Sequence, residues 1–192
     1  MSNPRAEAVA VGTSAGALEA LSVILPALPE NYPLPVLVVV HLPPDRESLM
    51  LDLLRRRCRI AVKEAEDKEP ITGGTVYLAP PDYHLLVETD RRLSLSSEEP
   101  VRYSRPSIDV LFETAAEAYG PGLVGVVLTG ANGDGSRGLR AICEAGGRAL
   151  VQEPGLALAS AMPQAALDAC PEARRLSLEA IAERLLGIVD PT

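Results

Sequence analysis

The sequence predicts an α/β fold, a doubly wound and mostly parallel sheet with a small antiparallel hairpin insertion. Short apolar runs alternate with stretches of helical spacing along most of the 192 residues. Aromatic residues are only 3% of the chain, so the core is built from Val, Leu, Ile and Ala, as in buried parallel sheets. Between residues 73 and 96 the alternation gives way to short strands and turns, which predicts the hairpin. Without repeats or linkers, residues 1–192 are expected to form a single domain.

The first part of the chain is expected to hold three strands and two helices. Strands are expected over residues 8–12, 36–40 and 60–65, and helices over residues 16–28 and 46–57. Asp45 is suited to cap the second helix, whose inner face would carry Leu49, Leu53 and Leu54.

The middle of the chain is expected to form the antiparallel insertion. Its strands are expected over residues 76–79, 83–88 and 91–96. Gly73-Gly74 and Thr89-Asp90 mark turns beside them, and no helical pattern separates the strands as it would in a βα unit.

Regular alternation then returns for the rest of the chain. Helices are expected over residues 108–119, 136–145, 163–168 and 178–188, and strands over residues 123–128, 148–152 and 173–176. Ser107 is placed to cap the first of these helices, and Gly146-Gly147 to end the second. Strands that alternate with helices imply right-handed crossovers and a parallel sheet.

Composition limits the partners and the location that we expect. The net charge is −8, which argues against nucleic acid and against an anionic membrane surface as partners. The first residues are polar, and no apolar run reaches the length of a membrane span, so we expect neither a signal peptide nor membrane insertion. The expected location is the cytoplasm.

The three cysteines are predicted to be small buried hydrophobes in a reducing compartment. Cys58, Cys143 and Cys170 are odd in number, scattered, and without a C-x-x-C pair. We therefore expect no disulfide framework and no zinc site. No metal-ligand cluster or cofactor motif is visible elsewhere, so the expectation is no metal and no cofactor.

A Gly-x-Ser-x-Gly turn follows the first strand, with Ser14 at its centre. Gly12 and Gly16 permit a sharp strand-to-helix bend, from which a serine hydroxyl would project at the end of the strand. The following helix would direct free N–H groups and its positive dipole end to the same place. Small residues are also common at helix starts, so the turn alone leaves a purely structural interpretation open.

His41 and Asp134 also follow predicted strands at their carboxyl ends, where open parallel sheets form their sites. A serine, a histidine and a carboxylate are the nucleophile, base and orienting acid of acyl transfer. Each has a plainer interpretation: His41 as a strand-end histidine, Asp134 as an N-cap of the helix after it. His84, in the hairpin region, is expected at the surface and not in catalysis.

The order and spacing of these residues exclude two common folds. The α/β-hydrolases place their histidine late and after the acid, but this chain has no histidine after His84. The first turn also lacks the Gly-x-Gly-x-x-Gly spacing of dinucleotide-binding domains, and the second strand ends in histidine instead of a ribose-binding carboxylate.

The chain resembles the catalytic domain of the chemotaxis receptor methylesterases (CheB) from about residue 9 to residue 170. Five segments carry the resemblance in the same order: VGTSAG at 11–16, VHLPP at 40–44, GTVYLAP at 74–80 with HLL at 84–86, RPSIDVLF at 105–112, and LTGANGDG at 128–135. The resemblance implies that Ser14, His41 and Asp134 are the catalytic triad. It also implies hydrolysis of glutamate γ-methyl esters on cytoplasmic helices of chemoreceptors, with deamidation of receptor glutamines as a related activity.

Departures from the family pattern point to a second hypothesis. Ala15 stands where a hydroxyl residue is common, and Ala131 where Met is usual. Both would adjoin the substrate, so the chain could be a CheB-like binding or regulatory module with weakened catalysis. An esterase that acts on another substrate is a third interpretation.

The segment before the first predicted strand is short. Only about seven residues precede the first strand, so we expect no receiver domain in this chain and regulation by a separate protein.

Three arginines near the predicted site loops are candidates for steering receptor carboxylates: Arg102, Arg105 and Arg137. The plainer interpretation is that they are solvated surface arginines.

Overall fold

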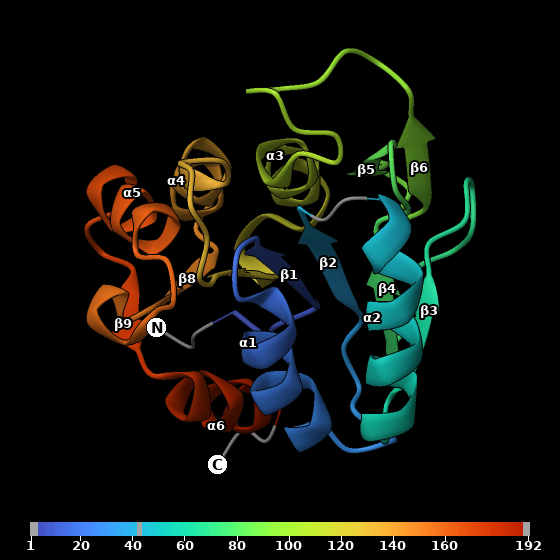
Figure 1. Cartoon of the computed structure of the whole chain (residues 1–192), viewed down its shortest axis with the longest axis horizontal. Coiled ribbons are helices and arrows are strands. Elements are labelled where there is room, and N and C mark those ends of the chain that lie inside the picture. The colour runs from blue at the N-terminus through green and yellow to red at the C-terminus, as the bar shows by residue number, and fades with distance from the viewer. Residues whose placement is uncertain (1–3, 42–43, 190–192) are drawn as a thin grey trace.

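A seven-stranded parallel sheet forms the centre of the molecule, in the order β3-β4-β2-β1-β7-β8-β9. The computed structural model describes residues 4–41 and 44–189 (Figure 1). The strands of this sheet are β1 (Ala8–Thr13), β2 (Val36–Val40), β3 (Ala61–Glu64), β4 (Thr75–Leu78), β7 (Leu123–Val127), β8 (Arg148–Gln152) and β9 (Arg174–Leu176). Each pairs with its neighbours in parallel register, which confirms the predicted fold class.

Helices cover both faces of this sheet (Figure 1). They are α1 (Ala17–Ile24), α2 (Pro44–Arg57), α3 (Ile108–Tyr119), α4 (Ser136–Glu144), α5 (Ala161–Ala169) and α6 (Leu178–Val189). Helices α1, α2 and α6 pack on one face, and α3, α4 and α5 pack on the other. Among the described residues, no helix has the length and apolar character needed to span a membrane.

The central strands are buried on both faces, and successive residues contribute to different cores. In β1, Val9 and Val11 join the core beneath α1 and α6, while Ala8 and Ala10 join the core beneath α3. This division follows from the two-residue period of a strand. It explains why the strand reads as a continuous apolar run instead of an alternating one.

The antiparallel insertion is smaller than the sequence suggests. Strands β5 (His84–Val87) and β6 (Leu93–Ser96) form an antiparallel pair, as expected. The assignment of residues 76–79 to the insertion is wrong, because β4 lies between β2 and β3 in the parallel sheet. Its residues Val76 and Tyr77 enter opposite cores, a burial that a short apolar run does not reveal.

Helix α2 has a different inner face from the one predicted. Leu54 is buried as expected, but Leu49 is 64% exposed and Leu53 is 37% exposed, and Met50 takes the buried position instead. The helix begins at Pro44, before the predicted start, and the side chain of Asp45, the expected cap, lies outside the described residues. The outer leucines face a groove between α2 and α1.

The expectation about cysteines is also wrong, because Cys143 and Cys170 form a disulfide. Cys143 lies in α4 and Cys170 follows α5, two helices that pack side by side. The pairing depends on that packing across 27 residues of sequence, which no local pattern signals. Cys58 is a free thiol and is half-buried.

Two glycines shape the turn after β1. A Cβ atom on Gly12 would lie 2.3 Å from Ile108 Cγ2, so only glycine permits α3 to approach the strand end this closely. Gly16 has a φ of +85°, a left-handed conformation that L side chains rarely adopt. The turn can therefore be sharp enough to leave Ser14 at the edge of the sheet.

Candidate active site

The three residues of the predicted triad lie at the carboxyl edge of the sheet. Ser14 follows β1, His41 follows β2 and Asp134 lies in the turn after β7. These are three adjacent central strands, and β1 is the strand from which the chain continues to either side. Ligand sites of open α/β sheets form at such a topological switch point.

His41 and Asp134 form a direct hydrogen bond. The Nε2 atom of His41 lies 2.8 Å from Oδ2 of Asp134, and the two side chains are 13% and 1% exposed. A neutral His41 therefore donates its Nε2 proton to the carboxylate and keeps Nδ1 as an acceptor, an assignment that follows from the partner. The Nδ2 atom of Asn132 lies 3.5 Å from that Nδ1.

Asp134 is held from several sides besides His41. Its carboxylate accepts hydrogen bonds from Ser107 Oγ at 2.9 Å, Ile108 N at 2.7 Å and Asp109 N at 3.0 Å. Burial alone would raise the pKa of Asp134, but the bonds from His41, Ile108 and Asp109 outweigh it and lower the pKa below its usual value. Asp134 is thus a fixed negative charge beside the imidazole.

The same bonds show that Asp134 caps a different helix from the one expected. Its carboxylate satisfies the free N–H groups at the start of α3, although it precedes α4 in the sequence. Ser107 occupies the N-cap position of α3 as expected, but its hydroxyl donates to Asp134 instead of capping the helix.

A second buried carboxylate, Asp109, completes the link between α3 and α4. Its Oδ1 accepts a hydrogen bond from Gly138 N of α4 at 2.7 Å, so each carboxylate caps the other's helix. Asp109 Oδ2 has no hydrogen-bond partner among the described residues. Burial raises the pKa of Asp109, the negative charge of Asp134 raises it further, and the Gly138 bond opposes both effects.

Thr129 fixes the turn that carries Ser14. The carbonyl of Thr129 accepts from Ser14 N at 2.9 Å and from Thr13 Oγ1 at 2.9 Å. Its own hydroxyl donates to the carbonyl of Ala15 at 2.8 Å. The end of β1 is therefore fastened to the turn after β7 by both backbone and side-chain bonds.

Ser14 and His41 line one groove of about 950 Å³ between α1 and α2. Its walls are mainly apolar, and Leu18, Leu49 and Leu53 face it. Ala15 is exposed in the same groove. The N–H groups of Ala15 and Gly16 donate no hydrogen bond to any residue in the described part of the chain, so both are free to meet a ligand.

The remaining candidates differ in how they relate to this site. Arg102 Nη1 donates to the carbonyl of Gly133 at 3.2 Å, next to Asp134, and Ala131 is exposed in the same turn. Arg105 instead binds Asp82 and two carbonyls of its own loop. Arg137 forms an ion pair with Glu113. Of the three arginines, Arg102 lies directly against the turn that holds Asp134.

His84 is not at the surface, and this expectation is wrong. Its side chain is 2% exposed, its Nδ1 accepts from Ser107 N at 3.1 Å, and its Nε2 lies 3.1 Å from the carbonyl of Glu99. His84 therefore supports Ser107, whose hydroxyl donates to Asp134. A histidine that begins a short strand offers no sign of this role in the sequence.

Several residues that support the predicted triad were not predicted from the sequence. Thr129, Asp109 and Asn132 all lie in the family-like segments but do not resemble catalytic groups. Asn132 carries one local signal, because Asx residues often bond a backbone N–H two positions on, and its Oδ1 accepts from Asp134 N at 3.0 Å. The roles of Thr129 and Asp109 depend on contacts between distant segments.

Comparisons with known proteins agree with this geometry. A family model described as CheB methylesterase matches residues 9–185. A protein of Leptospira interrogans named "Putative protein-glutamate methylesterase/protein-glutamine glutaminase" is 49% identical over 95% of this chain and 94% of its own length. The Archaeoglobus fulgidus protein-glutamate methylesterase/protein-glutamine glutaminase is 36% identical over 83% of this chain, which matches 47% of that longer protein.

Solved structures give the same result. The Thermotoga maritima CheB methylesterase catalytic domain superposes with a TM-score of 0.91 at 30% identity, covering 97% of this chain and all of that one. Fold, family model and relatives together confirm the resemblance seen in the sequence. The chain belongs to the CheB methylesterase family.

Proposed function

We propose that the chain is a serine hydrolase that removes methyl groups from glutamate γ-methyl esters on chemoreceptor helices, and that deamidates receptor glutamines. Ser14 is the nucleophile, His41 the general base and Asp134 the orienting acid. The observation that carries the proposal is the 2.8 Å bond between His41 and a buried Asp134 in the groove that Ser14 lines. The names of the relatives support the same substrate class.

The proposed reaction uses the free nitrogen of His41. Because Nε2 is bound to Asp134, Nδ1 takes the Ser14 proton as the hydroxyl attacks the ester carbonyl. Asp134 then stabilises the imidazolium, which returns the proton to the departing methanol. Water hydrolyses the resulting acyl-serine in the same manner and leaves a free glutamate carboxylate. With a glutamine substrate the leaving group is ammonia.

The free N–H groups of Ala15 and Gly16 are suited to stabilise the tetrahedral intermediate. Both lie at the amino end of α1, where the helix dipole also favours negative charge. A backbone donor does not depend on the side chain, so alanine at position 15 is compatible with catalysis. One such donor is typically worth about 100- to 1000-fold in rate.

The groove between α1 and α2 suits a substrate helix. Its exposed leucines can pack against the apolar face of an amphipathic helix, a common mode of peptide recognition. The groove leads to Ser14, so a helix lying in it would present an esterified side chain to the hydroxyl. Arg102, against the Asp134 turn, is the candidate for contact with neighbouring receptor carboxylates. These substrates would place the protein in the cytoplasm, under the control of a separate regulatory protein.

The test is the replacement Ser14→Ala, which should abolish methanol release from methylated receptor. Ser96→Ala, in the β5–β6 hairpin, is the matched control and should retain activity. Methanol release by the Ser14→Ala protein at the unmodified rate would refute the assignment.

A serine-reactive fluorophosphonate separates the enzyme from a CheB-like binding module. Stoichiometric labelling of Ser14 is expected for the enzyme, whereas an unlabelled protein that still binds receptor would be a module. Receptor peptides with free, methylated and amidated glutamates then distinguish the proposed substrates from an unrelated ester.

A further inference from the structure

A second pocket lies at the opposite edge of the sheet, where β8 and β9 begin. Its volume is about 230 Å³, and its polar lining includes Arg148, Arg174, Arg184, Glu172 and Cys143. Arg148 is the first residue of β8 and Arg174 the first residue of β9, whereas Arg184 belongs to α6. The triad follows the other ends of parallel strands, so the pocket is separate from the proposed active site.

The three arginines of this pocket have no ion-pair partner in the part of the chain that the structure describes. None of Arg148, Arg174 and Arg184 forms an ion pair with another described side chain. The Nε atom of Arg148 is buried without a hydrogen-bond partner among the described residues, and its Nη2 donates to the carbonyl of Pro4. Burial lowers the pKa of Arg148, and the charge of Arg184 lowers it further.

A bound anion would stabilise this arrangement, in which Arg174 is exposed and Arg148 and Arg184 are partly buried. Like charges repel, and a buried guanidinium atom without a partner costs free energy that a bound anion would recover. Elsewhere in this acidic protein, arginines near the site loops are engaged, as Arg105 is by Asp82 and Arg137 by Glu113. Three guanidinium groups against the single carboxylate of Glu172 leave the pocket positive.

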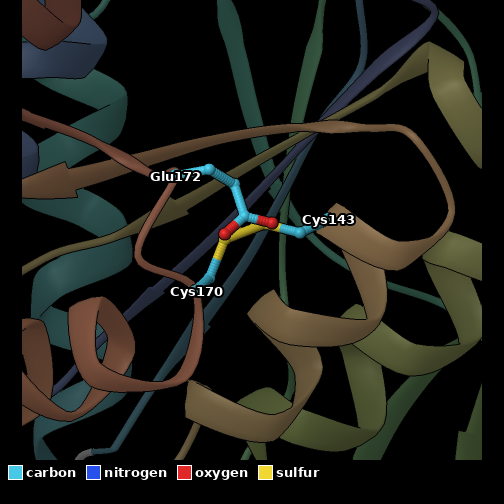
Figure 2. Close-up of side chains that lie close together, drawn as sticks. All are labelled: Cys143, Cys170 and Glu172. Atoms are coloured by element: carbon cyan, nitrogen blue, oxygen red, sulfur yellow. A yellow bond between two sulfur atoms is a disulfide. The ribbon is translucent and has the colours of Figure 1, made fainter.

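The wall of the pocket also carries a reactive bond. Figure 2 shows the Cys143–Cys170 disulfide with the Glu172 side chain directed toward it. The two sulfur atoms and a carboxylate oxygen of Glu172 all lie within 4.8 Å of one another. Cys143 is half-buried and lines the pocket, whereas Cys170 is buried. Cys143 is therefore the cysteine of this disulfide that lines the pocket.

We propose that this pocket is a thiol–disulfide exchange site, which takes an anionic low-molecular-weight thiol and uses it to reduce the Cys143–Cys170 bond. The arginines would bind the carboxylate of such a thiol, and the disulfide would receive its sulfur. Cationic clefts raise the local concentration of anionic reactants and thus the rate of encounter. The inference is independent of ester hydrolysis at Ser14.

The reaction proceeds by two displacements. The thiolate attacks Sγ of Cys143, a mixed disulfide forms, and Cys170 departs as a thiolate with the electron pair of the broken bond. A second thiolate then attacks the small-molecule sulfur of the mixed disulfide and releases Cys143 as a thiolate. The protein gains two electrons, two small thiols are oxidised to one small disulfide, and the protein thiolates take protons from solvent.

The experiment compares three small thiols of different charge on the oxidised protein: 3-mercaptopropionate, 2-mercaptoethanol and cysteamine. Reactions are stopped in acid, unfolded and treated with a maleimide, and mass spectrometry counts the alkylated cysteines. Oxidised protein should carry one adduct, on Cys58, and reduced protein should carry three. Rates are compared between variants for the same thiol, so that the differing pKa values of the thiols cancel.

Charge in the pocket should control these rates. We expect Arg184→Gln and Arg174→Gln each to slow 3-mercaptopropionate about three- to tenfold, as the loss of one nearby charge implies, and to leave 2-mercaptoethanol nearly unchanged. Glu172→Gln should accelerate the anionic thiol. Arg175→Gln is the matched control, because Arg175 adjoins Arg174 in β9 but faces Glu153.

Two results would overturn the proposal. Three adducts on air-oxidised protein before any thiol is added would show that the disulfide does not form. Equal slowing of all three thiols by the arginine substitutions would show that their charge does not steer the reaction. Should a variant fail to fold, the salt dependence of the unmodified protein gives the same decision. Added salt must then slow the anionic thiol and spare the neutral one.

Discussion

The two edges of the parallel sheet place charged side chains in opposite surroundings. At the carboxyl edge, Asp134 is 1% exposed and receives hydrogen bonds from His41, Ser107 and the start of α3. At the amino edge, Arg148, Arg174 and Arg184 share one pocket without acidic partners among the described residues. A group that orients a base must be held in one position by its neighbours. A group that receives a ligand is useful when its hydrogen-bonding capacity is still unfilled.

The largest effect in this comparison is expected at Asp134. Asp134→Asn keeps the shape of the side chain but removes the charge that stabilises a protonated His41 and selects its tautomer. The rate of ester hydrolysis should fall by about 10³- to 10⁴-fold. Steady-state methanol release measures the loss, and Asp168→Asn on α5 controls for the removal of a carboxylate elsewhere. A loss of less than tenfold would mean that the carboxyl edge does not depend on this fixed charge.

A smaller effect is expected at the amino edge when the disulfide is removed. Replacing Cys143 and Cys170 by serine removes a crosslink that closes a 27-residue separation, and should lower the free energy of unfolding by about 2–4 kcal/mol. Denaturant titration with and without a reducing agent measures this difference. The reducing agent should weaken only the unmodified protein. Equal stability of all four samples would indicate that the crosslink does not form.

The smallest effect concerns the partly satisfied carboxylate of the carboxyl edge, Asp109. Its pKa is raised in the folded protein, so the folded state binds its proton more tightly than the unfolded chain does. This group therefore costs stability as pH rises through the ordinary range of an aspartate. Asp109→Asn should gain about 1 kcal/mol relative to the unmodified protein between pH 4 and pH 7. Thermal melts at several pH values test this trend. A stability advantage of Asp109→Asn that grows as the pH falls would contradict it.

Asp134 is expected to change the stability of the protein with pH in the opposite direction. Its pKa is lowered in the folded state, so it contributes stability above the ordinary pKa of an aspartate. That stability is lost as pH falls through the folded value. The two carboxylates cap each other's helices, yet they respond to acid in opposite directions because only one of them is fully hydrogen-bonded.

Local patterns predicted the parts of the fold that depend on neighbouring residues. The strand Val36–Val40 and the helix Ile108–Tyr119 have the predicted bounds, because a doubly buried strand and an amphipathic helix each carry their own period. The placement of β4 was missed, since a four-residue apolar run does not specify which strands it will pair with. Leu49 and Leu53 were misplaced for a related reason: their groove exists only because α1 lies opposite α2.

The sequence by itself determined the sheet apart from β4, its helices and the three residues proposed for catalysis. It could do so because the carboxyl ends of parallel strands meet at one edge, so residues after different strands are brought together by topology alone. The tertiary structure decided that Asp134 caps α3, that His84 is buried behind Ser107, and that Cys143 meets Cys170. Each of these depends on the distance between two segments far apart in the chain, and that distance is set by the packing of whole helices.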